Sequence, residues 1–297
     1  MPNPVDISLP IYLQALGVLN AWVLKPAYML LGLFLLVRLA RYAAEEIRWL
    51  WWGLVAFEIG EFACAVNFLG YQMASVPLEM THNVGMVVTL GLFTMATLEI
   101  VDRRMLFQFA KARSCALVRF CRECPVRAGS SCRFKPLFVF VCSVGVLVSI
   151  LPFTKPPVID HPMRVQVFGH SVVCHHLPVY QMFENRVCPA AAVALFGACL
   201  IMLWRRNDPA LFAERVVFSF ALGCSLFAIF RFANHRINWD YPIWFDFWEE
   251  SLEWVTIAGV ALTLHLFRDR LLDDPAPAGE QGAGAGPNDP GKGTCHA

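Results

Sequence analysis

Apolar runs of membrane-spanning length recur along this chain, and they restrict its fold more than any other feature of the sequence. Each run is close to the roughly 20 residues that a helix needs to cross a bilayer. Of the 297 residues, 57% are hydrophobic and 16% are charged, and the mean hydropathy is +0.53. Soluble domains usually carry about 25% charged residues. The sequence therefore predicts an all-α, polytopic membrane helix bundle that lies in the lipid bilayer.

Seven spans are predicted, at about residues 26–41, 48–71, 77–100, 136–154, 188–205, 211–233 and 246–267. The first is the least defined, because the apolar stretch from Ile11 to Leu24 precedes it and Lys25-Pro26 interrupts it. Either one kinked helix covers residues 11–41, or an interfacial helix precedes a short span that begins at Pro26. The spans form one domain over residues 1–271. A tail rich in Pro, Gly and Ala follows at 272–297 and is expected to be disordered.

Basic residues in the connections predict the orientation. Nine lysines and arginines lie in the connection between the third and fourth spans, and the connections after the first, fifth and last spans are also basic. The positive-inside rule then places the N-terminus outside and the C-terminus inside. The loop at 102–135 is cytoplasmic and the loop at 155–187 periplasmic. Topology accounts for the basic residues, so the net charge of +1 gives no reason to expect a nucleic-acid partner.

Acidic residues inside the apolar runs give the main functional hypothesis. An ionised side chain at the bilayer centre costs about 2.5–3.5 kcal/mol on insertion scales. Glu58 and Glu61 nevertheless lie in the middle of the second run. The predicted topology brings seven candidate cofactor-binding residues to a similar depth in the outer half of the membrane: Glu58, Glu61, Glu79, His82, His235, Glu250 and Glu253.

The spacing of these residues agrees with a shared site. Glu58 and Glu61, Glu79 and His82, and Glu250 and Glu253 are each three residues apart, and such residues share one side of a helix. Three chemistries fit: an iron, manganese or zinc site, a quinone or haem site with His82 and His235 as an axial pair, and a proton or cation path. The Glu79-x-x-His82 spacing is also used in ferritin-like bundles, but the second Glu-x-x-His of those sites is missing.

Structural explanations for the same acids remain open. Asp246 and Glu249 can cap the seventh helix at the water interface. Glu79 follows Pro77 and can be an ordinary first-turn acid. Glu58 and Glu61 can form a buried pair with Arg231 or His235.

Four cysteines in the cytoplasmic loop form a second candidate site. Cys121-x-x-Cys124 lets two thiolates bind one metal, and Cys115 and Cys132 can complete a tetrahedron. Structural zinc is the simplest occupant and an iron–sulfur cluster is the alternative. The spacings match neither a ferredoxin nor a zinc ribbon, so reduced thiols without a metal remain an alternative.

The periplasmic loop carries a second group of cysteines and histidines. Cys174 and Cys188 are expected to form a disulfide, because the loop lies in an oxidising compartment. The histidines at 170, 175 and 176 are either surface residues or ligands of copper or zinc. The loop can also fold over the acidic cluster as a lid that brings His175 or Glu184 to it.

These observations lead to one main hypothesis and two alternatives. The main hypothesis is a multi-pass inner (plasma) membrane subunit of a redox or metal-handling system, with other membrane or cytoplasmic subunits as partners. The alternatives are a proton or metal-cation transporter or channel, and a non-catalytic anchor or assembly subunit. No lysine lies inside a predicted span, which argues against a retinal Schiff base, and no Walker motif is present. No particular reaction is indicated.

Overall fold

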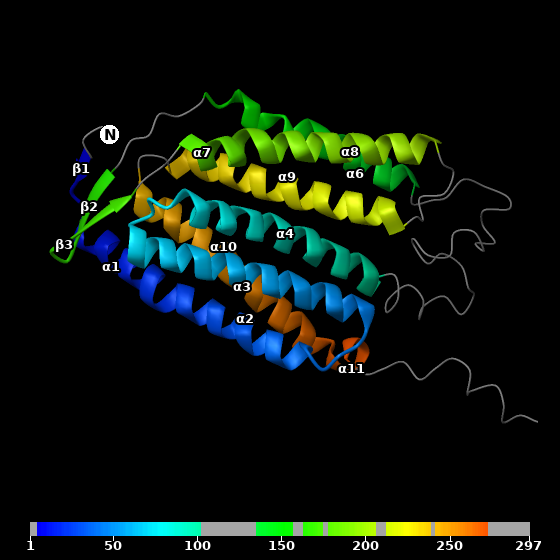
Figure 1. The fold of residues 1–297 in the computed structure, drawn as a ribbon, viewed down its shortest axis with the longest axis horizontal. Coiled ribbons are helices and arrows are strands. Elements are labelled where there is room, and N and C mark those ends of the chain that lie inside the picture. The colour runs from blue at the N-terminus through cyan, green and yellow to red at the C-terminus, as the bar shows by residue number, and fades with distance from the viewer. Residues whose placement is uncertain are drawn as a thin grey trace, which may run out of the picture.

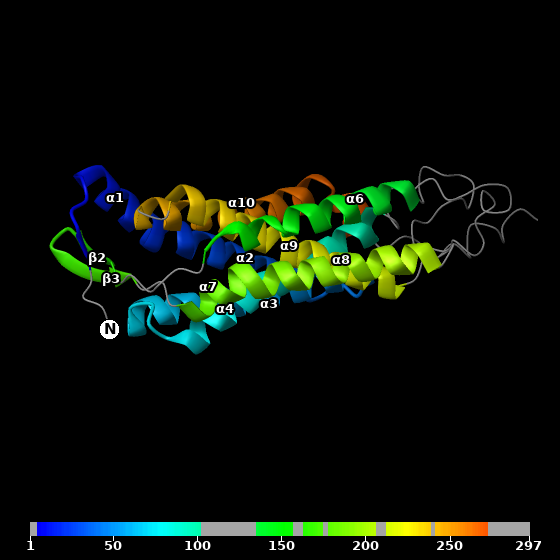
Figure 2. The ribbon, with the colours of Figure 1, turned by 90° about the horizontal axis from the view of Figure 1, so that it is seen from above.

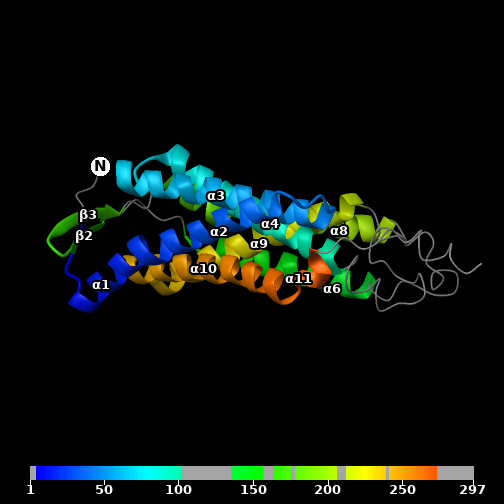
Figure 3. The ribbon, with the colours of Figure 1, turned by 90° about the horizontal axis from the view of Figure 1, so that it is seen from below.

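The helices lie side by side along one long axis and form an elongated bundle, as Figures 1, 2 and 3 show. This computed structural model describes residues 5–101, 135–156, 163–174, 178–205, 212–238 and 241–272. Nearly all of these residues are helical, in agreement with the predicted helix bundle. A small sheet lies at one end of the bundle and α11 (Arg268–Leu271) at the other (Figure 1), and we call these the sheet end and the α11 end.

The long helices match the predicted spans closely. After the N-terminal helix, they are α3 (Glu45–Tyr71), α4 (Val76–Ile100), α6 (Lys135–Ser149), α8 (Cys188–Arg205), α9 (Phe212–Asn238) and α10 (Pro242–Leu266). Six described helices, the N-terminal one included, are long and apolar enough to cross a membrane. The seventh predicted span, α10, has 25 residues but carries four acids in its first half. The protein is therefore a multi-pass membrane protein with six or seven spanning helices.

The N-terminal helix is one continuous element rather than a short span beginning at Pro26. It comprises α1 (Ile11–Leu19), a π-helical turn (Asn20–Leu24) and α2 (Lys25–Leu39), 29 residues in all. The N–H of Lys25 donates to the carbonyl of Asn20, five residues earlier. A π turn of this kind absorbs the irregularity at Pro26, which has no N–H to continue the helical ladder. Lys25 consequently lies inside the span, which corrects the expectation that no span contains a lysine.

The order of packing places α2, α3, α4, α9 and α10 around the site described below. α3 packs on α2 and α4, α4 on α9, and α10 on both α2 and α9, while α8 and α6 extend the bundle beyond α9. A short turn reverses the chain between α3 and α4. Gln72 and Met73 adopt the left-handed conformation in it, and the Asn67 side chain accepts a hydrogen bond from the N–H of Ser75 at 3.0 Å. This tight connection brings the end of α3 beside the start of α4.

Glycines allow close approach of three helices. A Cβ on Gly85 of α4 would lie 2.9 Å from the carbonyl oxygen of Ala56 in α3. A Cβ on Gly223 of α9 would lie 2.7 Å from the backbone nitrogen of Gly91 in α4. Small residues at such crossings are typical of membrane helix packing. The α3–α4–α9 layer is therefore held at backbone-to-backbone distance, which fixes the relative positions of its polar side chains.

A three-stranded sheet was not anticipated by the all-helical prediction. It consists of β1 (Val5–Ile7), β2 (Met163–Val167) and β3 (His170–Cys174), in the order β1-β2-β3. β2 and β3 form a hairpin whose two-residue turn, Phe168-Gly169, has positive φ at both positions, as the right-handed strand twist requires. The short helix α7 (Pro178–Met182) and a π turn (Phe183–Val187) then lead into α8. Much of the predicted outer loop is thus regular structure.

Candidate functional site

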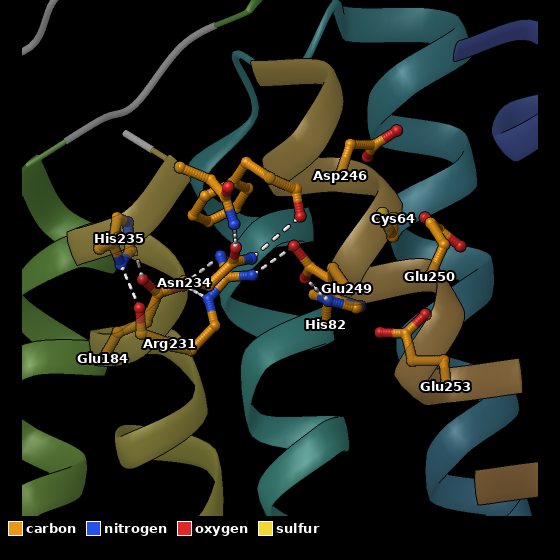
Figure 4. Close-up of polar contacts among 12 residues, drawn as sticks. Cys64, His82, Glu184, Arg231, Asn234, His235, Asp246, Glu249, Glu250 and Glu253 are labelled. Carbon is orange, nitrogen blue, oxygen red and sulfur yellow. Dashed lines mark hydrogen bonds and ion pairs between the residues drawn. The ribbon is translucent and has the colours of Figure 1, made fainter. Parts of the chain in front are cut away.

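Polar side chains from five helices and one π turn meet in the sheet-end half of the bundle. The α3–α4 turn sets Glu61 opposite His82, while the α2 face that carries Lys25 and Tyr28 packs against α3 and α10. Figure 4 shows Glu249 of α10 beside His82 and facing Arg231, whereas Asp246, Glu250 and Glu253 lie on the side away from Arg231. Their contacts divide into two groups that Glu249 joins.

Lys25 holds the first group together. Its Nζ lies 2.7 Å from Glu61 Oε2 and 2.8 Å from Glu250 Oε1, and it is 3.5 Å from the Sγ of Cys64. The Glu61 side chain is completely buried. A buried carboxylate is tolerated where a cation and hydrogen bonds compensate the lost hydration, and Lys25 supplies that cation. One ammonium group thus links the N-terminal helix to α3 and α10.

Tyr28 lies at the centre of three carboxyl groups. Its hydroxyl oxygen is 2.6 Å from Glu61 Oε2, 2.5 Å from Glu250 Oε2 and 2.8 Å from Glu253 Oε2. A phenol donates only one hydrogen bond. The two remaining contacts are hydrogen bonds only if the carboxyl group donates its own proton to the phenol oxygen. These three acids therefore need protons or a cation among them, and Glu61, which faces Lys25, is the one best placed to stay ionised.

His82 bridges the two groups from α4. Its Nδ1 lies 3.3 Å from Glu61 Oε1 and its Nε2 lies 3.4 Å from Glu249 Oε1. The ring is almost fully buried. A carboxylate on one ring nitrogen fixes the orientation of a histidine and leaves the other nitrogen to bind a ligand.

Arg231 of α9 organises the second group. Its guanidinium contacts Glu184 Oε1 through Nε at 2.8 Å and through NH2 at 2.6 Å, and it also pairs with Glu249 through NH1. His235, one turn later on α9, donates from Nδ1 to the carbonyl oxygen of Arg231 at 2.8 Å and faces Glu184 Oε2 at 3.8 Å. Figure 4 shows Arg231, Glu184 and His235 on one side of Glu249, and Glu250 and Glu253 on the other.

The charges of the two groups do not balance without protons or a bound cation. Two permanent cations, Lys25 and Arg231, are in contact with acids of this region. The carboxyl groups that the contacts above join are those of Glu61, Glu184, Glu249, Glu250 and Glu253. Uncompensated charge is expensive in a buried site, so the excess of acids must be neutralised. Protonated histidines, protonated acids and a metal ion are the means that this arrangement offers.

Three of the predicted residues lie close enough together to hold one metal ion. One ligand atom from each of Glu61, His82 and Glu253 lies within 4.8 Å of the other two. All three residues are buried. Glu61 Oε1 and His82 Nδ1 face each other without forming a hydrogen bond of acceptable geometry. Two carboxylates and an imidazole suit iron, manganese or zinc.

The other predicted ligands lie elsewhere. Glu250 is in the first group through Lys25 and Tyr28, and His235 is in the second. Glu79 lies in the first turn of α4 and accepts a hydrogen bond from Asn67 Nδ2 at 3.1 Å, as the structural explanation anticipated. Glu58 points toward Gly32 of α2. The pairing of Glu58 or Glu61 with Arg231 or His235, considered from the sequence, does not occur.

Asp246 and Glu249 are not caps of the seventh helix. α10 begins at Pro242, its first turn holds no acid, and no side chain caps its start. Asp246 accepts from Asn20 Nδ2 at 3.2 Å, and Glu249 pairs with Arg231 and His82. Helix α10 thus begins several residues earlier than predicted, so both acids lie beyond its first turn; Asp246 is exposed and Glu249 is half-buried.

Glu184 reaches the cluster, but not from a lid. It lies in the π turn that continues into α8 and is completely buried against Arg231.

The predicted disulfide is absent, since Cys188 is a free, buried thiol at the start of α8. His170 is exposed in β3, and His175 and His176 lie outside the described residues. Cys115, Cys121, Cys124 and Cys132 of the cytoplasmic loop also lie outside them, so the cysteine site stays a prediction.

Polar residues nearer the α11 end are occupied by other contacts. The Thr89 hydroxyl bonds to the carbonyl oxygens of Gly53 and Gly85, and Thr94 and Thr97 bond to carbonyls of their own helix. Glu99 forms a buried ion pair with Arg215 of α9. His265 is exposed on α10. These side chains do not form a polar row that continues the cluster toward the α11 end.

Comparison with known proteins assigns no family. No protein-family model matches the chain, and no curated protein or solved structure is significantly similar to it. The polar cluster itself is therefore the basis on which a function is proposed.

Proposed function

We propose that this protein is a multi-pass subunit of a metal-handling or redox system in the inner (plasma) membrane, and that it binds a divalent transition-metal ion at Glu61, His82 and Glu253. The proposed orientation has the N-terminus and the sheet end outside. The observation that carries the proposal is the convergence of the three ligand atoms within 4.8 Å inside a buried, acid-rich cluster.

The surroundings of His82 support a metal ligand rather than a simple structural histidine. Glu249 lies at Nε2 and Arg231 holds Glu249 in turn. Where Nε2 carries the proton toward Glu249, Nδ1 keeps its lone pair, and that atom faces Glu61 Oε1. Carboxylate-supported histidines of this kind are typical of metal sites. The tautomer is inferred from these partners.

The excess of acids supports binding of a cation in particular. A divalent ion between Glu61 and Glu253 adds positive charge to a cluster whose acids Lys25 and Arg231 alone do not balance. Iron, manganese and zinc all accept a carboxylate–imidazole donor set, and redox chemistry is open only to the first two. The internal hydrogen bonds of Thr89, Thr94 and Thr97 favour a binding site over a continuous path.

Metal titration of the purified full chain in detergent tests the proposal. The variants E61Q and H82A are compared with wild type for binding of Mn²⁺, Fe²⁺ and Zn²⁺, each measured by calorimetry and by elemental analysis. All three proteins also carry serine at Cys115, Cys121, Cys124 and Cys132, so that the cysteine loop does not contribute. We expect wild type to bind one ion per chain and both variants to lose it.

E79Q is the matched control, because Glu79 is an equally buried acid of the same region that hydrogen-bonds to Asn67 instead. It should retain the ion. Absence of binding in wild type, or equal binding in wild type, E61Q and H82A, contradicts the metal site.

A further inference from the structure

Glu58 is a buried acid that neither group of the cluster uses. It lies on α3 three residues before Glu61, and the residue is 9% exposed. Its Oε1 is completely shielded and has no hydrogen-bond partner. In the described part of the chain Glu58 forms no ion pair. It therefore differs from Glu61, which has Lys25, Tyr28 and His82 around it.

A glycine on the neighbouring helix makes room for the Glu58 carboxyl group. A Cβ on Gly32 of α2 would lie 2.0 Å from Glu58 Oε1 and 3.2 Å from its carboxyl carbon. Gly32 is buried, and glycine in a helix interior is about 1 kcal/mol less favourable than alanine. The acid thus fills the space that any larger side chain on α2 would take, and we call this space the Gly32 niche.

The charged groups near Glu58 do not compensate a negative charge there. Along α3 the nearest is Glu61, itself an acid, and along α2 the nearest titratable group is Tyr28, four residues from Gly32. From α10, Glu253 contacts the same Tyr28 hydroxyl. The ammonium of Lys25 is engaged by Glu61 and Glu250. An isolated buried carboxylate costs several kcal/mol and takes up a proton instead.

We infer that Glu58, held in the Gly32 niche, is a proton-binding site that supplies protons to the neighbouring cluster and takes them back. Two neighbouring turns of α2 face two neighbouring turns of α3. Tyr28 contacts Glu61 at one level, and Glu58 fills the space beside Gly32 at the next. The rise of a helix separates residues three apart by about 4.5 Å along the axis, a distance that a rotation of the Glu58 side chain can bridge. The inference does not depend on a metal at the cluster.

Infrared spectroscopy of the full chain at neutral pH tests the inference directly. A protonated carboxyl group gives a carbonyl-stretch band that is separate from carboxylate bands and shifts in D₂O. We expect E58Q to lose the intensity of one such group per chain relative to wild type. E45Q is the matched control on the same helix: Glu45 is only partly buried, in the first turn of α3, so this variant should leave the band unchanged.

A second measurement applies if E58Q does not fold. Dicyclohexylcarbodiimide is an apolar reagent that adds to protonated carboxyl groups in apolar surroundings, and mass spectrometry of the wild-type chain then identifies the labelled residue. Label on Glu58 supports the inference. An unchanged carbonyl band in a folded E58Q, or an unlabelled Glu58 where E58Q does not fold, overturns it, and neither result bears on metal binding.

Discussion

Lys25 Nζ lies 2.7 Å from Glu61 Oε2, and this buried ion pair joins the N-terminal helix to α3. The helix needs such an attachment, because only 22% of the residues in its most apolar window are buried inside the bundle. The variant K25M leaves Glu61 and Glu250 without their cation. Breaking a buried pair on one side costs about 3–5 kcal/mol, so we expect a clear fall in the melting temperature measured in detergent.

The double variant K25M/E61Q separates this pair from a general loss of packing. If the cost of K25M comes from the unpaired carboxylate, the double variant should be more stable than K25M alone. Additive losses would show that the two side chains contribute independently and would contradict the pairing.

Among the arginines that the structure describes, substitution of Arg231 is expected to lower the stability most. R231M leaves the completely buried Glu184 unpaired and also removes the partner of Glu249. We expect destabilisation of about 3–5 kcal/mol. R231K should be intermediate, because an ammonium cannot make the forked contact that the guanidinium makes with Glu184 through Nε and NH2.

Arg164 provides the comparison. It pairs with Asp6 at 3.4 Å across the sheet, but the two side chains are 40% and 76% exposed. R164M should change the stability by less than about 1 kcal/mol. Equal thermal shifts for R231M and R164M would show that burial of the Arg231 network contributes nothing.

The bundle followed from run length alone, whereas run length left two alternatives for the N-terminal helix, of which the single helix over residues 11–41 agrees with the structure. Six of the predicted spans correspond to helices whose ends differ from the prediction by only a few residues, because the apolar runs and flanking prolines mark them. Lys25-Pro26 looked like an interruption. The π turn at Asn20–Leu24 carries the helix through it, and no pattern in the sequence marks where a helix will widen locally.

The acids of the site were identifiable, whereas of its two cations only Arg231 was considered, and with other acids than those it contacts. Glu61, His82 and Glu253 were selected because ionisable groups are rare inside apolar runs, and the structure brings them together. Lys25 and Tyr28 were missed because their partners lie 225 residues away on α10 and in the middle of α3. One signal existed: acids inside spans require cations, and Lys25 lies between two apolar stretches, residues 11–24 and 26–41.

Two glycines in the helices should respond in opposite directions to alanine. In G223A the new methyl group would lie 2.7 Å from the backbone nitrogen of Gly91 and 2.9 Å from the carbonyl oxygen of Val87, so α4 and α9 must separate. Overpacking of this kind costs about 1–3 kcal/mol. In G259A nothing lies within 4 Å, and alanine in a helix should stabilise by about 0.4–1 kcal/mol. A melting temperature that falls in both variants, or in neither, contradicts the close α4–α9 approach.

Lys155 should make the stability depend on pH in the alkaline range. It follows the 3₁₀ turn Leu151–Thr154, beyond the end of the fourth span, and its side chain is buried. Burial lowers the pKa of Lys155 from its ordinary 10.5 to about 8; Glu184 opposes this, and Arg231, Arg236 and Arg186 add to it. At a pH between about 8 and 10.5, Lys155 is protonated in the unfolded chain and largely deprotonated in the folded one, so the unfolded chain binds more protons. The free energy of unfolding should therefore rise as the pH increases from about 8 toward about 10.5.

The variants K155M and K155R measure this effect through the melting temperature at about pH 7 and about pH 9.5. At the lower pH the native chain must hold a buried ammonium, so K155M should be more stable than wild type. At the higher pH the wild-type lysine has lost its proton, and the difference should shrink. The arginine of K155R stays charged at both pH values. At about pH 9.5, K155R should therefore be less stable than wild type and K155M. A difference between K155M and wild type that does not change with pH would show that Lys155 stays protonated throughout and that its burial does not disfavour the charge.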